Sequence, residues 1–243
     1  VFFVTINLVG QFKAGSVILQ ALLHDSATYQ RLVGSFAAMI LRRIEAADGS
    51  LRFAGLLNDE AAPGTCIGAD AVIGPFSAWR DCPADTGFLV PLHKSKAMPA
   101  RAALIGRLGI PSDRWATVAD PAAIVATDAS IGAGCFLAPH AIVMPQARLG
   151  RHVAMRQSAS VGHDATIGEF VMIGVNAAIA GYCRIGDGVF IGLGALVREN
   201  LTVGRYSVVG MGAVVKRAVP DYAIVAGNPA TLIGEQQTEA ERR

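Results

Sequence analysis

The sequence VGHDAT-IGEFVM-IGVNAA, residues 161–178, consists of three consecutive six-residue units, each of which opens with an aliphatic residue followed by glycine. Stepping by six from Ile131 to Val215 gives fifteen positions, and all of them are aliphatic or methionine. The residue four places later is small in nearly every unit. Because it lies two residues before the next aliphatic residue, both side chains point to the same face of a short strand. Each unit is therefore predicted to be a short strand and a corner around a shared interior.

Glycine follows the aliphatic residue in nine of the fifteen units, where a tight corner needs backbone freedom. Three strands that close a triangular coil use about 18 residues, so the repeat predicts a parallel β-helix of about five coils, about 24 Å long. A glycine-rich β-sandwich is the alternative, but that fold does not hold one phase through fifteen units. The β-helix is the preferred prediction.

A coil of this length places every third unit on the same face of the prism, which sorts the outward-facing residues. The first face carries Phe136, Ala154, Met172, Phe190 and Val208; the second face carries Ile142, Ser160, Ala178, Leu196 and Val214; the third face carries Arg148, Thr166, Arg184, Thr202 and Pro220. Two faces are apolar, and soluble monomers seldom expose two such patches. We expect cyclic self-association that buries Phe136, Met172 and Phe190 between protomers. Cover by the chain's own N-terminal part is the alternative.

Residues 1–115 lack the repeat and predict an α/β domain, residues 116–234 the β-helix, and residues 235–243 a polar tail. The expected elements of the first part are a strand at 1–9, a glycine turn at 10–15, a helix that opens at 16–23 and continues irregularly through 27–47, strands at 51–57 and 88–92, and a helix at 98–108. A strand, a glycine turn, a helix and a strand ending in Asn58 and Asp59 outline a nucleotide-binding half-unit. Equally, the two glycines only permit a turn.

The composition limits the classes of partner that we expect for this protein. A net charge of +2 gives no electrostatic reason to expect nucleic acid or a membrane surface, and 52% hydrophobic residues suffice for a large core. The four cysteines show no paired spacing, which favours free thiols in a reducing, cytoplasmic compartment.

Two segments resemble motifs of a known protein family: the unit that contains Gly162-His-Asp, and the closing segment Ala226-Gly-Asn-Pro-Ala. The chain resembles the bacterial hexapeptide-repeat sugar acetyltransferase family, which includes sialic acid O-acetyltransferases and nucleotide-linked 4-amino-sugar N-acetyltransferases. This resemblance implies a Rossmann-like α/β half-domain followed by a left-handed parallel β-helix. It also implies a homotrimer with active sites between protomers, acetyl-CoA as the co-substrate, and no metal.

Carried over by position, the resemblance implies that His163 is the catalytic base and that Asp164 is the adjacent acid that supports it. Further residues fall on the family's binding positions: Met172, Leu193 and Met211 for acetyl-CoA, and Phe12, Lys13, Ala14, Asn58, Asp59 and His93 for the sugar nucleotide. The chain departs from the family's pattern at the glycine turn, at Asn58 in the acidic pair, and at His93, which replaces a glycine.

The repeat itself adds two expectations about chemistry. His163 falls at a coil corner beneath Gly181 of the next coil, whose backbone N–H would meet the carbonyl oxygen of the thioester. Leu193 and Met211 share another corner above Val175, where an apolar ladder fits the pantetheine arm of the donor. The alternative to a catalytic role is that His163 is an ordinary exposed corner histidine, as His152 and His140 are expected to be.

The function expected from these features is acetyl-CoA-dependent acetylation of the amino group of a nucleotide-linked amino sugar. The alternatives are O-acetylation of sialic acid or another sugar, and a catalytically inactive scaffold. A γ-type carbonic anhydrase needs three histidines around one metal. His140 and His152 fall on other corners than His163, so metal catalysis is not expected.

Overall fold

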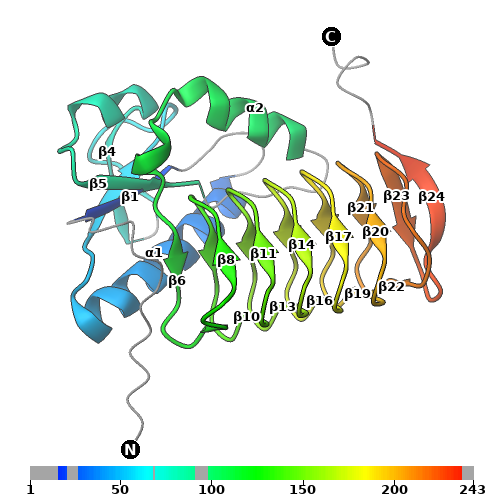
Figure 1. Ribbon diagram of the computed structural model, residues 1–243. Coiled ribbons are helices and arrows are strands. Elements are labelled where there is room, and N and C mark those ends of the chain that lie inside the picture. Colours follow the sequence, from blue (N-terminus) through cyan, green and yellow to red (C-terminus); the bar gives the residue numbers. More distant parts are fainter. Residues whose placement is uncertain (1–15, 21–26, 68, 91–97, 237–243) are drawn as a thin grey trace, which may run out of the picture.

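The computed structural model describes residues 16–20, 27–67, 69–90 and 98–236, with side-chain surroundings from residue 36 onward. A small α/β unit lies at one end of a long triangular prism, and a β-hairpin closes the other end (Figure 1).

The α/β unit contains one five-stranded sheet in the order β3-β4-β2-β1-β5. Its strands are β1 (Ser16–Gln20), β2 (Phe53–Leu57), β3 (Cys66–Ile67), β4 (Asp70–Gly74) and β5 (Thr86–Leu89). All neighbours are parallel except β3, which is antiparallel to β4. The helices are α1 (Ala27–Asp48), which joins β1 to β2, α2 (Met98–Leu108), and two 3-10 turns, η1 (Phe76–Asp81) and η3 (Ser112–Arg114).

The prediction of a helix starting at residue 16 is wrong, because Ser16–Gln20 is the strand β1 between β2 and β5. A central parallel strand has the same continuous apolar composition as a buried helical segment, and periodicity does not separate the two. The expected strand at 1–9 and the glycine turn at 10–15 lie outside the described residues. The chain between β1 and α1 is residues 21–26, so the glycine turn does not join β1 to α1.

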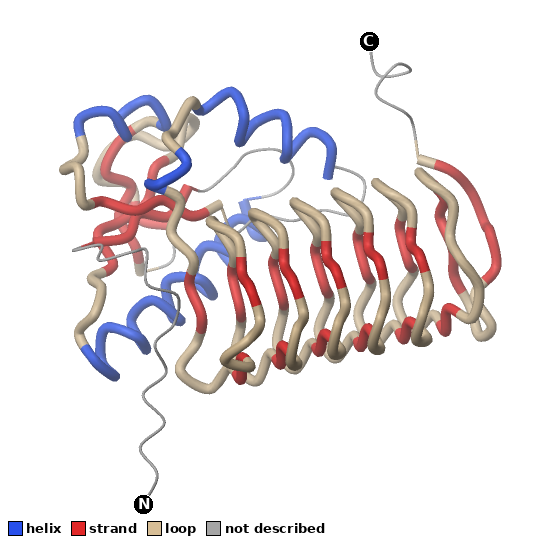
Figure 2. The backbone as a smooth tube through the Cα atoms, in the orientation of Figure 1, coloured by secondary structure: helices blue, strands red, loops and turns tan. Residues whose placement is uncertain are grey.

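Each face of the prism is a parallel sheet of two-residue strands, with one strand from each coil (Figure 2). The first face holds β6 (Val118–Ala119), β9 (Phe136–Leu137), β12 (Ala154–Met155), β15 (Met172–Ile173), β18 (Phe190–Ile191), β21 (Val208–Val209) and β23 (Ala223–Ala226), with β24 (Thr231–Glu235) antiparallel to β23 at its end. The second face holds β7 (Ile124–Val125), β10 (Ile142–Val143), β13 (Ser160–Val161), β16 (Ala178–Ile179), β19 (Leu196–Val197) and β22 (Val214–Val215). The third face holds β8 (Ser130–Ile131), β11 (Arg148–Leu149), β14 (Thr166–Ile167), β17 (Arg184–Ile185) and β20 (Thr202–Val203).

The strand register follows the predicted repeat. Ala154 pairs with Phe136 on one side and Met172 on the other, and the strands of the other two faces pair in the same way. The predicted sorting of outward residues onto the first and second faces is confirmed strand by strand. The prism also starts earlier than the unit at Ile131, because β6 and β7 already pair with the next coil.

The interior of the prism is filled by the aliphatic and small residues of the repeat, which form one continuous buried core. The coils stack closely at the corners. A Cβ built on Gly162 would lie 2.5 Å from the backbone nitrogen of Gly181, so only glycine permits this approach.

Helix α1 covers the first three coils of the first face. The Phe36 ring meets the Phe136 ring at a centroid distance of 6.0 Å and an interplanar angle of 73°. Phe136 and Ala154 share a buried core with Ile40 and Leu41 of α1. The expectation that Phe136 is buried between protomers is therefore wrong, because the chain's own helix already buries it.

Two ion pairs attach α1 to its surroundings. The Arg43 guanidinium donates to both carboxylate oxygens of Asp120, at 2.7 and 3.1 Å, and Asp120 is almost fully buried at the start of the prism. Arg42 pairs with the buried Asp70 of β4. These contacts fix the helix between the sheet and the first coil.

We expect Phe136→Ala to lower the free energy of unfolding by about 3–5 kcal/mol, because it opens a cavity under α1. Phe190→Ala, on the same face but half-exposed, should lower it by at most about 2 kcal/mol. Chemical denaturation of both variants measures the difference. Equal losses would show that α1 does not cover the first face as described.

Candidate active site

His163 lies at a corner of the prism, between β13 on the second face and β14 on the third face. The backbone N–H of Asp164 donates to the carbonyl of Pro145 one coil before, at 3.1 Å, and the His163 carbonyl accepts from the N–H of Tyr182 one coil after, at 3.0 Å. Asp164 has a left-handed backbone, with φ of 57°, which closes the corner. The base candidate is thus held by hydrogen bonds to the coils on both sides.

The imidazole of His163 has two different edges. Its Nδ1 lies 2.9 Å from Oδ2 of Asp164. A carboxylate only accepts hydrogen bonds, so the proton of the neutral ring lies on Nδ1 and Nε2 keeps its lone pair. Both side chains are about half exposed, which leaves the pair open to a substrate.

Gly181 forms the backbone surface against which this ring lies. A Cβ built on Gly181 would be 2.8 Å from both Cε1 and Nε2 of His163. Among the backbone hydrogen bonds of the described residues, the Gly181 carbonyl accepts from Asn200, while its N–H donates to none. The predicted proximity of His163 and Gly181 is therefore present, and an N–H is available beside the imidazole.

The ring of Tyr182 also contacts His163, which the sequence reasoning missed. The two ring centroids are 4.9 Å apart with an interplanar angle of 89°. The signal was present in the sequence, since Tyr182 is 18 residues after Asp164 and therefore stacks on it at the same corner.

Apart from Gly181, the residues predicted to hold the donor are not beside His163 in one chain. Leu193 and Met211 share the corner between the first and second faces, stacked above Val175 as predicted, since Gly194 donates to Val175 and Gly212 to Leu193 at 2.8 Å. Their side chains are highly exposed. Met172 lies on β15 of the first face and is buried. His163 is at the opposite edge of the second face from Leu193 and Met211.

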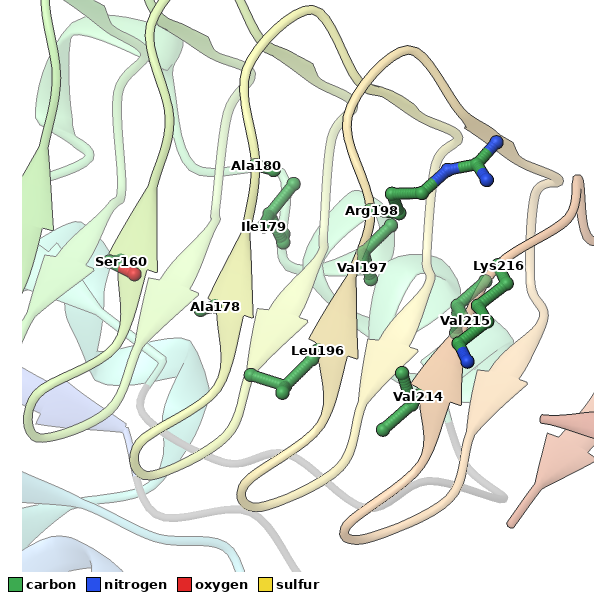
Figure 3. A pocket seen from close by; sticks show the side chains of 10 residues that line it. All are labelled: Ser160, Ala178, Ile179, Ala180, Leu196, Val197, Arg198, Val214, Val215 and Lys216. Carbon is green, nitrogen blue, oxygen red and sulfur yellow. The ribbon is translucent and has the colours of Figure 1, made fainter. Parts of the chain in front are cut away.

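The second face between these two edges carries an open groove of about 530 Å³ (Figure 3). Its lining residues are Ser160, Ala178, Ile179, Ala180, Leu196, Val197, Arg198, Val214, Val215 and Lys216. Arg198 and Lys216 follow β19 and β22 directly, on the edge that also carries His163. Leu196 is 46% exposed and Ile124 61% exposed, so a single chain leaves this apolar face open.

The carried-over acidic pair shapes a turn at the end of β2. Oδ1 of Asn58 accepts from the N–H groups of Glu60 and Ala61, at 2.7 and 2.9 Å, and Asn58 is buried. Oδ1 of Asp59 accepts from the N–H of Phe76 at 2.7 Å. Phe12, Lys13, Ala14 and His93 lie outside the described residues, and the assignment of all six residues to the acceptor stays a prediction.

His152 is buried, whereas the sequence analysis expected an exposed corner residue. Its ring stacks on Phe170 at 5.2 Å and meets the edge of Trp115 at 4.8 Å. Burial, with smaller contributions from the positive charges of Arg101 and Arg151, lowers the pKa of His152 to about 3. The sequence pattern assigned the corner but did not show that Trp115 covers it.

Arg101 of α2 is the buried cation of this junction. Its guanidinium donates to the carbonyls of Val90 and His152, at 3.2 and 3.3 Å, and burial lowers its pKa to about 9. These contacts join α2 to β5 and to the prism, so His152 and Arg101 serve packing.

The described residues contain no group of three or more His, Cys, Asp or Glu side chains that would hold a metal ion. Across the described part of the chain, no helix has the length and apolar character needed to span a membrane.

Comparison with known proteins identifies the class. The model of the bacterial transferase hexapeptide (six repeats) family matches residues 164–199. No curated protein matches the chain. The acetyltransferase domain of PglB from Neisseria gonorrhoeae, solved in complex with acetyl coenzyme A, is 25% identical with a TM-score of 0.73, over 90% of this chain and all of that one.

Two further structures share the architecture. WeeI from Acinetobacter baumannii is 23% identical with a TM-score of 0.73, over 90% of this chain and 100% of that one. PerB from Caulobacter crescentus, solved with CoA and GDP-perosamine, is 22% identical with a TM-score of 0.71, over 91% and 98% of the two chains.

The fold and the repeat define a hexapeptide-repeat acyltransferase. Within that class, the predicted resemblance to bacterial sugar acetyltransferases is confirmed, as is the fold class of a Rossmann-like half-domain followed by a left-handed parallel β-helix.

The buried neutral state of His152 predicts a pH-dependent stability. Its pKa is about 3 in the folded chain and about 6.5 when unfolded, so between these values the unfolded chain binds the additional proton. The neutral His152 therefore contributes its full share to the free energy of unfolding above about pH 6.5. This share is lost progressively as the pH falls toward 3. His152→Phe keeps the aromatic stack without titrating, and should flatten that part of the unfolding free-energy profile. Parallel profiles for the two proteins would contradict the assignment.

Proposed function

We propose that the chain is an acetyl-CoA-dependent acetyltransferase that acts on the amino group of a nucleotide-linked amino sugar, with His163 as general base. The observation that carries this proposal is the pairing of His163 with Asp164. Nδ1 of His163 lies against the Asp164 carboxylate, and the Nε2 edge of the ring lies against Gly181, whose N–H makes no backbone hydrogen bond among the described residues. The PglB domain with acetyl coenzyme A and PerB with CoA and GDP-perosamine support the choice of donor and acceptor class.

The geometry supports a direct transfer. Nε2 of His163 removes a proton from the acceptor nitrogen as this nitrogen attacks the thioester carbonyl. The N–H of Gly181 stabilises the negative charge that develops on the carbonyl oxygen. The C–S bond then breaks as the amide forms, and the thiol of CoA leaves with the proton from the imidazolium. Asp164 holds the ring in one tautomer and stabilises its cationic form.

Leu193 and Met211 are proposed to bind the pantetheine arm, with Met172 and Gly181 completing the donor site. Exposed apolar side chains stacked along a corner are unusual in a soluble protein unless something apolar lies on them. The groove on the second face adds Arg198 and Lys216, two cations beside the same face.

The acceptor is proposed to bind the α/β domain, residues 1–115, through Phe12, Lys13, Ala14, Asn58, Asp59 and His93. The rest of the proposed site lies in the β-helix domain, residues 116–234. Asn58 and Asp59 fix the turn at the end of β2, which is where α/β sheets bind ligands. A cytoplasmic location suits acetyl-CoA and the free thiols of the described cysteines.

We further propose that the active protein is a homotrimer whose second faces meet. Within one chain, the width of the second face separates His163 from Leu193 and Met211, so the site of a single chain is incomplete. A neighbouring copy packed on the face would bring its Leu193 edge to the His163 edge of the first. The exposed Ile124 and Leu196 supply the apolar surface that such a contact needs.

His163→Ala should lower kcat for acetyl transfer by roughly 10²–10⁴-fold and leave acetyl-CoA binding within a few-fold, because a base acts in the transition state. Asp164→Asn should give a smaller loss. Thiol release from acetyl-CoA, followed across a panel of nucleotide-linked amino sugars and sialic acids, measures both and separates amine from hydroxyl acceptors. His140→Ala, an exposed corner histidine elsewhere, is the control, and wild-type turnover by His163→Ala would end the assignment.

Leu196→Glu should dissociate the trimer and remove activity, because it places an unpaired carboxylate in a desolvated contact. The matched variant Thr202→Glu lies in the same coil on the exposed third face and should leave the assembly intact. Light scattering on both variants tests this. A Leu196→Glu protein of unchanged mass would show that the second face is not the contact.

A further inference from the structure

Tyr182 occupies a backbone position that suits it poorly. Its φ is 60°, in the left-handed region that bulky side chains rarely adopt, and glycine or asparagine is preferred there. One coil further along the same corner, the equivalent position is Asn200 with φ of 59°. Tyr182 is also 53% exposed, so its ring gains little from burial. Local backbone preference and burial therefore do not account for a tyrosine here.

Aromatic residues at another corner of the prism show what usually supports such a ring. Tyr206 and Tyr222 also have positive φ, and their rings stack on each other at 5.6 Å. Phe170 stacks in the same way on His152. Tyr182 makes its ring contact with His163 instead, at 4.9 Å and nearly perpendicular. The aromatic ring at this corner is matched to the candidate base.

His163 is bounded on three sides as a result. Asp164 holds Nδ1, the backbone of Gly181 lies against Cε1 and Nε2, and the Tyr182 ring stands across the imidazole. A half-exposed side chain with one hydrogen bond exchanges rotamers within nanoseconds. Contact with the Tyr182 ring removes part of the space in which the imidazole could otherwise turn.

We propose that Tyr182 is a positioning residue that holds the His163 imidazole in the rotamer with Nδ1 on Asp164 and Nε2 on the Gly181 side. The role needs the aromatic ring and not the hydroxyl. Its catalytic consequence rests on the proposed function of His163, whereas the restraint on the ring does not.

Tyr182→Asn is the decisive variant, because asparagine fits the left-handed backbone and removes only the ring. We expect its melting temperature to stay the same or rise, while kcat falls roughly 10-fold with the KM for both substrates unchanged. Tyr182→Phe should recover most of that loss. Tyr222→Asn makes the same exchange at φ of 60° on another corner and should leave kcat unchanged.

Nitrogen-15 NMR of the His163 imidazole gives a readout that does not depend on turnover. The wild-type ring should show one tautomer, protonated on Nδ1, and Tyr182→Asn should show averaging of tautomer and rotamer. If the wild-type protein transfers no acetyl group, the proposed function fails, and this spectrum still decides the role of Tyr182.

Three results would overturn the inference. The first is wild-type kcat and an unchanged imidazole spectrum in Tyr182→Asn. The second is a loss in Tyr182→Phe as large as that in Tyr182→Asn, which would assign the effect to the hydroxyl. The third is a change confined to the KM of the acceptor, which would make Tyr182 an acceptor contact.

Discussion

The stacking of one coil on the next is the constraint on which the rest of the structure depends. From β9 to β19, each strand of the prism pairs with the strands 18 residues before and after it, and the corners add hydrogen bonds such as that from Tyr182 to His163. A residue's position within its unit therefore fixes its face and the residues above and below it. His163, Gly181 and Tyr182 come from consecutive coils at one corner, so the stacking alone assembles this part of the candidate site.

The two apolar faces have different fates. Helix α1 packs on the first face through Phe36 and Phe136 and is held in place by the Arg43–Asp120 pair. The second face has no such cover in the described part of the chain and carries the groove with Leu196. One apolar face therefore packs against the chain's own helix, whereas the other stays exposed at the edge of the candidate site.

The repeat made most of the prism predictable, because a fixed period converts sequence position directly into spatial position. This is why the faces and the contact between His163 and Gly181 followed from the sequence. The α/β unit has no repeat, so β1 was mistaken for the start of a helix. Phe136 was expected to be buried by another protomer, with cover by the chain's own N-terminal part as the alternative, and the burial of His152 was missed. Their covers, Phe36 and Trp115, come from segments distant in sequence whose packing no local pattern encodes.

Rings and glycines occur as partners on neighbouring coils. The imidazole of His163 lies on Gly181, that of His152 on Gly134, and the ring of Tyr206 on Gly188. At these three places the coil against which the ring packs has no Cβ, and this absence makes room for the ring. The height of the His163 imidazole along the prism is consequently set in steps of one coil, about 4.8 Å. Moving the imidazole by one coil, to position 181, would place it below Glu199 instead of a glycine, so the ring would lose this close approach to the backbone of the next coil.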